Sequence, residues 1–421
     1  MTTASLLLGT FLLRVNGGAS ALLVGRFLAQ LVPRHGHAIT SVEVGLLSVA
    51  YFIVDLSLSP VMGALSDRWG RRLFLTLGPL VGLLQVTGLF FTTADNPFPY
   101  LLCLQVLAGI SSAMQVPAVL GYLADYTAHQ PALRARVMSF YELVTSGGLA
   151  VGVAAAGFVW DYCGRASFLL LGVGYLGAAC CMFAIPRLKP ILKHAEERPL
   201  LSRYGRLLRS PRLFVFIPAW VSIFALIGIW FSSQLTFLLS SRRHLPGQVF
   251  MGSLSANGAG GHVSLILGAI VLFFGLCLLF WAFFLNKVPR SFLMLSSIAG
   301  IYLACLGLSG LNHNETGNPL LTAFGVLGLL IGLFAETAFA PAALAHLADL
   351  SEEAARDRGV LMGLYSVFLG LGQLLGNGLG GMFAEQWGFD GLIYLTLLLA
   401  GVALISLLLL LRAERKQPAL Q

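Results

Sequence analysis

The sequence predicts an all-α polytopic membrane protein with twelve transmembrane helices in two parallel six-helix halves. Three observations support this fold class: a very apolar composition, twelve apolar runs of membrane-spanning length, and an internal repeat at one fixed offset. The chain has 421 residues, of which 57% are hydrophobic and 10% are charged. Its mean hydropathy of +0.85 excludes a water-soluble globule, and its low charge excludes a disordered chain.

The apolar runs define the predicted helices. A helix needs about 20 residues to cross the hydrocarbon core, and each run is that long. Because lipid offers no hydrogen-bond partners, runs without the short alternation of barrel strands must be helices. The first run lacks the basic start of a secretory signal, so it is counted as a span. The predicted spans are residues 5–30, 41–65, 73–94, 99–124, 137–160, 167–186, 213–239, 263–286, 292–311, 320–347, 361–384 and 390–411.

The basic residues predict the orientation of these spans. Of the 26 Lys and Arg residues, twenty lie in the connections after even-numbered spans or in the C-terminal tail, and four lie on the opposite side. Because positive charge gathers on the cytoplasmic side, we expect both termini inside and the protein in the plasma (inner) membrane. The net charge of +8 then reflects topology and contact with membrane lipid, not nucleic-acid binding.

The chain divides into two similar halves. The basic stretch 187–212 is expected to be a cytoplasmic linker between an N-terminal half, 1–186, and a C-terminal half, 213–421. Residues 117–127 read PAVLGYLADYT and residues 341–351 read PAALAHLADLS, at an offset of 224. Since this offset equals six helices, the halves run parallel, and a cavity between them is expected to open to each side in turn.

The connection after the second span carries a specific motif. Residues 63–72 read GALSDRWGRR. They resemble the signature of the major facilitator superfamily, Gly-x-x-x-Asp-x-x-Gly-Arg-Arg/Lys, in residue types, spacing and position. Without the family, the same residues would read as a tight Gly turn with cytoplasmic positive charges. The resemblance implies a transporter rather than an enzyme.

In that family the loop latches the two halves on the cytoplasmic side. The resemblance implies that Asp67 faces the start of the eleventh helix and that Arg71 or Arg72 pairs with Asp125. The equivalent loop of the second half, residues 286–291, has no acidic residue, so a latch there is expected to be weaker. The expected latch residues are Gly63, Asp67, Gly70, Arg71, Arg72 and Asp125.

Two departures from the family pattern leave the direction and ion coupling open. Proton-linked members often carry Arg four residues before a Gly in the fourth span, where this chain has Gln105 and Gly109. Antiporters tend to have a Gly-Pro pair in the fifth span, which here has glycines without the proline.

Five ionisable residues lie inside predicted spans, where a charge costs at least about 2.5 kcal/mol. They are Arg14, Arg26, Asp55, Glu142 and Glu336. In one interpretation Arg14 pairs with Asp55 or Glu142 and holds the first half together. In the other, Arg14 and Asn16 contact the substrate or a counter-ion, Asp55 lies in the same central region, and Glu142 or Glu336 takes up and releases a proton. Glu336 is preferred because its counterpart in the first half is Ser112, which cannot match its charge.

Further polar and aromatic side chains in the spans are candidates to line the cavity. These are Gln105, Gln115, Gln234, Trp230, Tyr365 and Gln373, although helix packing or interfacial anchoring is the better explanation for each of them taken alone. Pro60, Pro117, Pro218 and Pro341 are expected to kink their spans. The six Cys lack ligand spacing, so neither a metal site nor a cofactor is expected.

Together these features predict a monomeric secondary transporter that moves a small organic solute by alternating access. Proton-coupled export of an amphipathic compound is the preferred hypothesis. The alternatives are uptake or facilitated diffusion of a polar metabolite, and a non-transporting receptor or assembly factor with the same fold.

Overall fold

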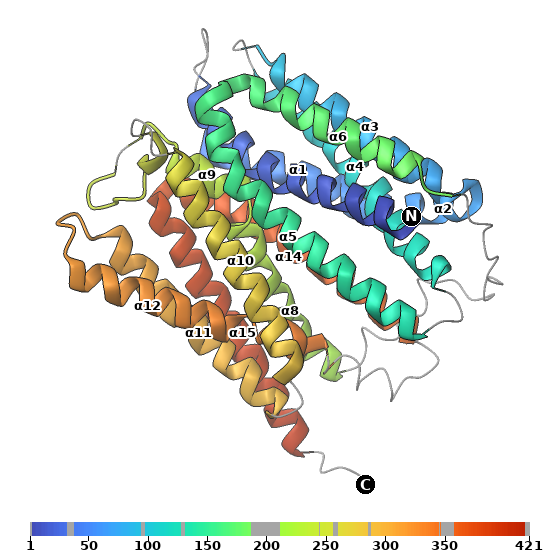
Figure 1. Cartoon of the computed structure of the whole chain (residues 1–421). Helices are drawn as coiled ribbons and strands as arrows, with labels where there is room; N and C mark the ends of the chain where they lie inside the picture. The colour runs from blue at the N-terminus through green and yellow to red at the C-terminus, as the bar shows by residue number, and fades with distance from the viewer. Residues whose placement is uncertain are drawn as a thin grey trace. The chain divides into compact units, whose positions relative to one another are not determined.

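The computed structural model of the chain is all-helical, with no strand in the residues that it describes. The described residues are 2–31, 38–93, 97–127, 131–186, 211–243, 245–255, 260–284, 288–344, 346 and 358–416. Figure 1 shows the helices, which are α1 (Thr2–Gln30), α2 (Ser41–Trp69), α3 (Arg71–Phe90), α4 (Pro97–Tyr126), α5 (Pro131–Cys163), α6 (Ser167–Phe183), α8 (Pro211–Trp230), α9 (Ser233–Leu239), α10 (Gly260–Phe284), α11 (Arg290–Asn312), α12 (Pro319–Glu336), α14 (Arg358–Trp387) and α15 (Phe389–Lys416).

The described helices account for the predicted spans. Ten helical stretches are long and apolar enough to cross a membrane, and α8 with α9, bent by 43°, makes an eleventh. One of the ten, Leu143–Phe183, contains both α5 and α6, which are joined by a short 3-10 turn at Gly164–Ala166. Counting α5 and α6 separately gives the twelve crossings that the sequence predicts.

Helix ends follow local sequence signals. Thr40 and Glu43 form a capping box at the start of α2, in which each side chain accepts a hydrogen bond from the backbone of the other residue. Gly70, with φ of 96°, is the single residue between α2 and α3. Because L-residues with a side chain rarely adopt this φ, a glycine allows the chain to reverse within one residue.

The prolines differ in their effects. Helices α2, α4 and α8 continue through Pro60, Pro117 and Pro218. In the tenth predicted span, by contrast, α12 ends at Glu336, a turn follows at Thr337 and Ala338, and helical structure resumes at Phe339. Pro341 explains this break, since it has no N–H to donate to the carbonyl of Thr337, four residues earlier.

By their contacts, the residues group into two compact units. Unit 1 comprises Met1–His194, Ser232–Arg242 and Gly252–Leu272, and unit 2 comprises Ala195–Phe231, Arg243–Met251 and Phe273–Gln421. This grouping follows packing, whereas the predicted division at 187–212 follows the repeat. Residues 187–210 lie outside the described residues.

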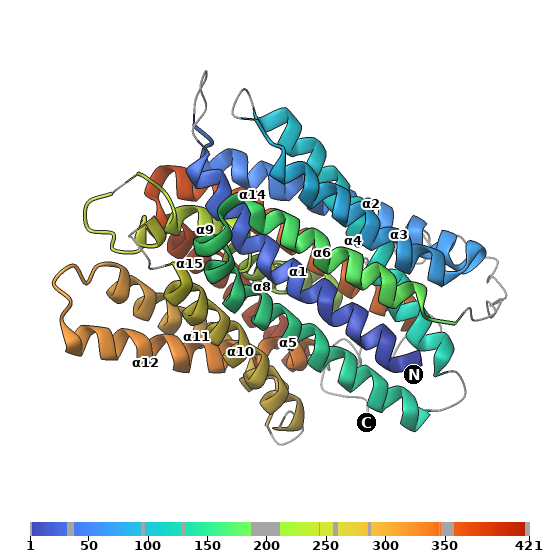
Figure 2. The ribbon, with the colours of Figure 1, turned by 45° about the horizontal axis from the view of Figure 1, so that its top comes forward.

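The packing inside each unit repeats. In unit 1, α1 packs on α5 and α6, and α3 packs on α6. In unit 2, α8 packs on α14 and α15, and α11 packs on α15, which are the equivalent pairs six spans later. Figure 2 shows the neighbouring α11 and α12 of unit 2. The repeat seen in the sequence is therefore also a repeat of helix contacts.

Candidate functional site

The turn between α2 and α3 positions the residues of the predicted latch. Gly63 on α2 lies close to α4, since a Cβ built there would be 3.4 Å from Pro117 Cβ. One turn later Ser66 donates to the Gly63 carbonyl, and Gly70 then reverses the chain. As a result Asp67 and Arg71 lie on either side of the reversal and face one another.

Arg71 is the centre of this group. Its guanidinium forms ion pairs of 2.5 Å with Asp125 on α4 and 2.6 Å with Asp67. The Asp125 side chain is 16% exposed and the Asp67 side chain 59%, so the pair with Asp125 is the better shielded from water. Gly121 provides the space, because a Cβ there would lie 1.8 Å from Arg71 Nη1.

Arg72 points elsewhere. Its guanidinium carbon lies 4.5 Å from the centre of the Phe183 ring at the end of α6, in the geometry of a cation–π contact. Of the two arginines considered from the sequence, Arg71 is therefore the one paired with Asp125.

A second polar group lies within the apolar part of unit 1. We call it the Asp55 cluster: Arg14 on α1, Tyr51 and Asp55 on α2, Ser112 on α4 and Tyr141 on α5. Asp55 accepts a hydrogen bond from Ser59 at 3.3 Å, and Ser112 hydrogen-bonds both Asp55 and Tyr51. Arg14 donates to Tyr141 Oη at 3.4 Å.

Arg14 acts on Asp55 through space. Its charge interacts electrostatically with Asp55 and Tyr51, yet no ion pair within 4.0 Å joins Arg14 to a carboxylate in the described part of the chain. The side chain of Glu142, the other partner considered, lies outside the described residues. The cluster thus holds one positive and one negative group near each other without closing them into a salt bridge.

Sequence reasoning missed Tyr51 and Ser59. The signal was present, since Tyr51, Asp55 and Ser59 are spaced four residues apart and therefore share one face of α2. Tyr and Ser are common in spans, so only their alignment with the charge of Asp55 distinguishes them.

Glu336 lies in unit 2 at the last position of α12, where the helix breaks. The backbone is close to α11, since a Cβ at Gly300 would be 3.0 Å from the Glu336 nitrogen. The carboxyl group interacts electrostatically with Cys305, also on α11. Its counterpart at the offset of 224 is Ser112, a member of the Asp55 cluster.

Three other candidates are bound at contacts between helices. Asn16 donates to the Leu171 carbonyl on α6 at 3.2 Å. Gln115 donates to Ser111, which in turn donates to the Gly78 carbonyl of α3. Trp230 Nε1 donates to Thr396 on α15 at 3.0 Å. These hydrogen bonds lie at contacts between helices, and the functional roles of the three side chains stay predictions.

The remaining cavity candidates differ in their surroundings. Gln234 on α9 is 1% exposed, and neither amide atom has a hydrogen-bond partner in the described part of the chain. Gln105 and Gln373 are partly buried, on α4 and α14. The side chain of Tyr365 lies outside the described residues.

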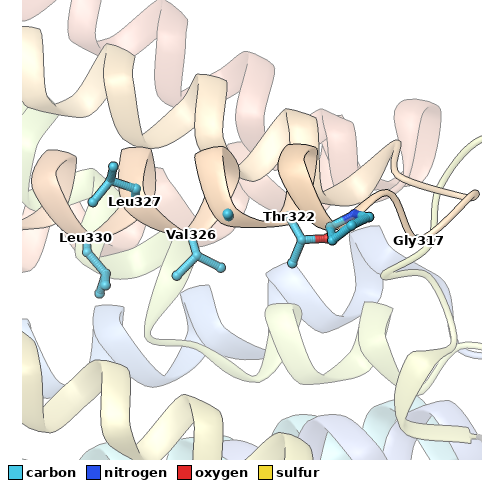
Figure 3. A pocket seen from close by; sticks show the side chains of 7 residues that line it. Gly317, Thr322, Val326, Leu327 and Leu330 are labelled. Atoms are coloured by element: carbon cyan, nitrogen blue, oxygen red, sulfur yellow. The ribbon is translucent and has the colours of Figure 1, made fainter.

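An apolar groove of about 730 Å³ lies along α12 (Figure 3). It is lined by Gly317, Pro319, Thr322, Ala323, Val326, Leu327 and Leu330. Only 17% of this span is buried, and a face of this kind is a normal lipid contact in a membrane protein.

Comparison with known proteins identifies the family. The family model for the Major Facilitator Superfamily matches residues 6–263 and 253–421, which together cover nearly the whole chain. The chain belongs to the major facilitator superfamily. It is therefore a multi-pass membrane transporter.

Relatives within the superfamily include drug-resistance proteins. The chain is 25% identical over 372 residues to "Multidrug resistance protein 2" of Bacillus subtilis (strain 168), covering 86% of this chain and 83% of that one. It is 25% identical over 384 residues to "Quinolone resistance protein NorA" of Staphylococcus aureus (strain COL), covering 90% of each. The solved nucleoside transporter NupG has a TM-score of 0.74 at 14% identity, covering 99% of this chain and 100% of that one, which shows the shared fold.

Proposed function

We propose that this transporter exports small amphipathic organic compounds from the cytoplasm in exchange for protons. The observation that carries the proposal is the Asp55 cluster, where a carboxylate, a guanidinium and two tyrosines from three helices meet in an apolar bundle. The names of the two relatives concern resistance to drugs, and this supports export of organic molecules over uptake of a metabolite.

The chemistry of the cluster suits exchange. Ionised Asp55 offers a negative group for the polar end of a solute, and the rings of Tyr51 and Tyr141 offer surface for its apolar body. A proton bound by Asp55 removes that negative charge, so proton and solute compete for one site. Competition at a site that opens to each side in turn is sufficient to couple their movements in opposite directions.

Glu336 is the second proposed proton carrier. It occupies the position in the second half that Ser112, a cluster member, occupies in the first. It also lies at a helix break, a feature that marks substrate and ion sites in transporters built from repeats. Glu142 stays a candidate on its sequence position alone.

We also propose that the Arg71 end of the molecule faces the cytoplasm and that Asp67, Arg71 and Asp125 stabilise the state in which this end is closed. The charge asymmetry of the connections supports the orientation. The partly buried pair between Arg71 and Asp125 supports the latch, because an ion pair of this geometry fixes the α2–α3 turn, which contains Asp67, against α4.

The export proposal can be tested in proteoliposomes with an imposed pH gradient. The assay uses a fluoroquinolone and a cationic amphipathic dye as probes and follows lumenal pH with a trapped indicator. We expect each transported probe to move opposite to protons. Asp55→Asn should weaken binding of the cationic dye and abolish proton-driven transport, whereas Glu336→Gln should abolish proton-driven transport while retaining exchange of probe for probe. Glu315→Gln, in an exposed turn, is the matched control and should transport normally.

Other outcomes are equally informative. Movement of probe and protons in the same direction would overturn export in favour of uptake. Unchanged proton-driven transport in both Asp55→Asn and Glu336→Gln would overturn the assignment of the coupling residues. Absence of flux for every probe and for a panel of polar metabolites, with a correctly folded protein, would favour the receptor alternative.

A further inference from the structure

The structure contains a second charged contact, at the opposite end of unit 1 from Arg71. Arg26, one helical turn before the end of α1, forms a 2.7 Å ion pair with Asp161 near the end of α5. The Arg26 side chain is 8% exposed and that of Asp161 26% exposed. Since α1, α3 and α5 all run from the Arg71 end toward this one, the two ion-pair groups lie a full span apart.

Asp161 also binds the start of α10. Its Oδ2 accepts a 2.8 Å hydrogen bond from the backbone N–H of Gly261, the second residue of that helix. The first N–H groups of a helix have no partner within the helix and carry partial positive charge. The carboxylate of Asp161 thus bridges Arg26 of the first repeat and the α10 terminus of the second.

Glycines make this arrangement possible. A Cβ at Gly260 would lie 2.2 Å from Arg26 Nη1 and 2.5 Å from Asp161 Oδ1. Any other residue at the first position of α10 would therefore displace the ion pair. The tight fit indicates that α1, α5 and the start of α10 are closely packed at this contact.

Below the ion pair, α5 and α10 pack backbone to backbone. A Cβ at Gly157 would lie 2.3 Å from the Gly260 carbonyl, and one at Gly268 would lie 2.5 Å from Ala154 Cβ. Ser264, which is 0% exposed, donates to the Ala154 carbonyl at 3.1 Å. Similar contact joins α9 to α1, where Thr236 donates to the Ala21 carbonyl and Gly25 leaves room for the Thr236 side chain.

We propose that Arg26, Asp161 and the first turn of α10 form a latch that keeps this end of the transporter closed and must break before it can open. The latch joins segments of the two sequence repeats, which alternating access requires to separate at one end at a time. Nε and Nη1 of Arg26 are buried without a partner among the described residues, so the closed state leaves donors of this arginine unused. Because these buried donors are unpaired, the closed state is less stable than a fully hydrogen-bonded one, and the latch can break.

The test measures access to the seam between α5 and α10. In a protein whose six cysteines are replaced by serine, Ser264→Cys serves as the reporter and a membrane-impermeant maleimide as the probe. We expect slow labelling with the latch intact, and labelling at least about tenfold faster in Arg26→Leu and Asp161→Asn, since each change removes the ion pair and Asp161→Asn also leaves the buried Arg26 charge unpaired. Arg26→Lys, which keeps the charge, should give an intermediate rate.

Arg165 supplies the matched control. It lies at the same end but donates to backbone carbonyls of Thr92 and Leu89 and stacks over Phe27, all within the first repeat. Arg165→Leu should therefore leave labelling of the reporter slow. Equal labelling in the wild type, Arg26→Leu and Asp161→Asn would overturn the latch, and so would fast labelling in Arg165→Leu.

A charge swap tests the role of the helix terminus. The double variant Arg26→Asp with Asp161→Arg restores an ion pair but places a positive group at the positive end of α10, so we expect fast labelling to persist. Recovery of slow labelling would overturn the part assigned to α10. Hydrogen exchange of Gly260–Leu272 provides a readout without cysteines, and exchange as slow in Asp161→Asn as in the wild type would also count against the latch. Neither measurement needs a substrate, so both are independent of the proposed export.

Discussion

At the scale of single residues, a glycine determines the geometry of the Arg71 group. Arg71 reaches Asp125 by crossing α4 at Gly121, where any side chain would occupy the space of the guanidinium. The motif in the α2–α3 turn supplies the arginine, but α4 supplies both the acid and the gap. The family signature therefore describes only part of the latch.

Substitution of Gly121 should expose this dependence. Gly121→Ala is expected to lower the stability of the purified protein by about 1–3 kcal/mol, the usual cost of overpacking, and to move Arg71 away from Asp125. In that background Asp125→Asn should add little further loss. Thermal unfolding of the four proteins in this double-mutant cycle is the measurement.

Gly147→Ala is the matched control for this cycle. A Cβ at Gly147 meets nothing within 4 Å, so alanine there should be neutral or slightly stabilising. An equal loss of stability in Gly121→Ala and Gly147→Ala would contradict the assigned role of Gly121.

Charged candidates are easier to find in the sequence than neutral ones, because a charge in an apolar run, as at Asp55, or in a recognised motif, as at Arg71, is conspicuous. Of these predictions, the pairing of Arg71 with Asp125 is confirmed. Asn16, which was predicted to contact the substrate or a counter-ion, donates to Leu171 on α6, and Gln115, a predicted cavity residue, donates to Ser111 one turn earlier on α4. Those partners are far away in the sequence or indistinct among other serines, so no sequence pattern reveals them.

At the scale of helices, small residues set how closely neighbours approach. Between α11 and α12, a Cβ at Gly307 would lie 2.5 Å from the Gly325 carbonyl, and one at Gly332 would lie 2.5 Å from the Gly300 carbonyl. Close backbone contact of this kind is a main source of helix association in lipid, where burial of apolar surface from water is absent.

Two alanine substitutions three residues apart on α11 test this contact. Gly307→Ala is expected to destabilise the protein by about 1–3 kcal/mol because the new methyl group would meet the backbone of α12. At Gly310 the nearest atom would be Leu321 Cδ1 at 3.6 Å, so Gly310→Ala should be tolerated. Melting temperatures in detergent compare the two, and similar values would refute the packing role of Gly307.

Helix breaks were only partly predictable. Pro341 indicated an irregularity in the tenth span, and the structure has one at Thr337 and Ala338. The break between α8 and α9 has neither Pro nor Gly in it. Ser232 starts α9 by accepting a hydrogen bond from the Gln234 N–H, and a serine in an apolar run is too common to signal a new helix start.

At the scale of the whole molecule, twelve crossings place both termini on the same side of the membrane. We expect that side to be the cytoplasm because of the charge asymmetry. A fluorescent protein that folds only in the cytoplasm should be active when fused to either end, and alkaline phosphatase fused to either end should be inactive. Phosphatase fused in the exposed turn at Glu315 should be active, and inactivity there would contradict the orientation.

The number of spans and the repeat were predictable because both depend on composition and spacing along the chain. The sequence does not indicate which end of unit 1 contains segments of both repeats. That depends on contacts such as Asp161 with Gly261, which join residues 100 positions apart. The residues involved are an acid near a helix end and a glycine, and neither is unusual by itself.

The grouping of residues into units has a consequence for the covalent chain. Between Phe231 and Phe273 the backbone passes from one unit to the other four times, because Ser232–Arg242 and Gly252–Leu272 belong with unit 1 and Arg243–Met251 with unit 2. A polypeptide severed at 187–212 would therefore give a first fragment that lacks Ser232–Arg242 and Gly252–Leu272, two segments of unit 1 that would lie in the second fragment. The first fragment would leave Gly25 and Gly157 uncovered, and only co-expression with the second would supply the segments that pack there. The gene can be divided at that point, but unit 1 needs segments from both sides of the division.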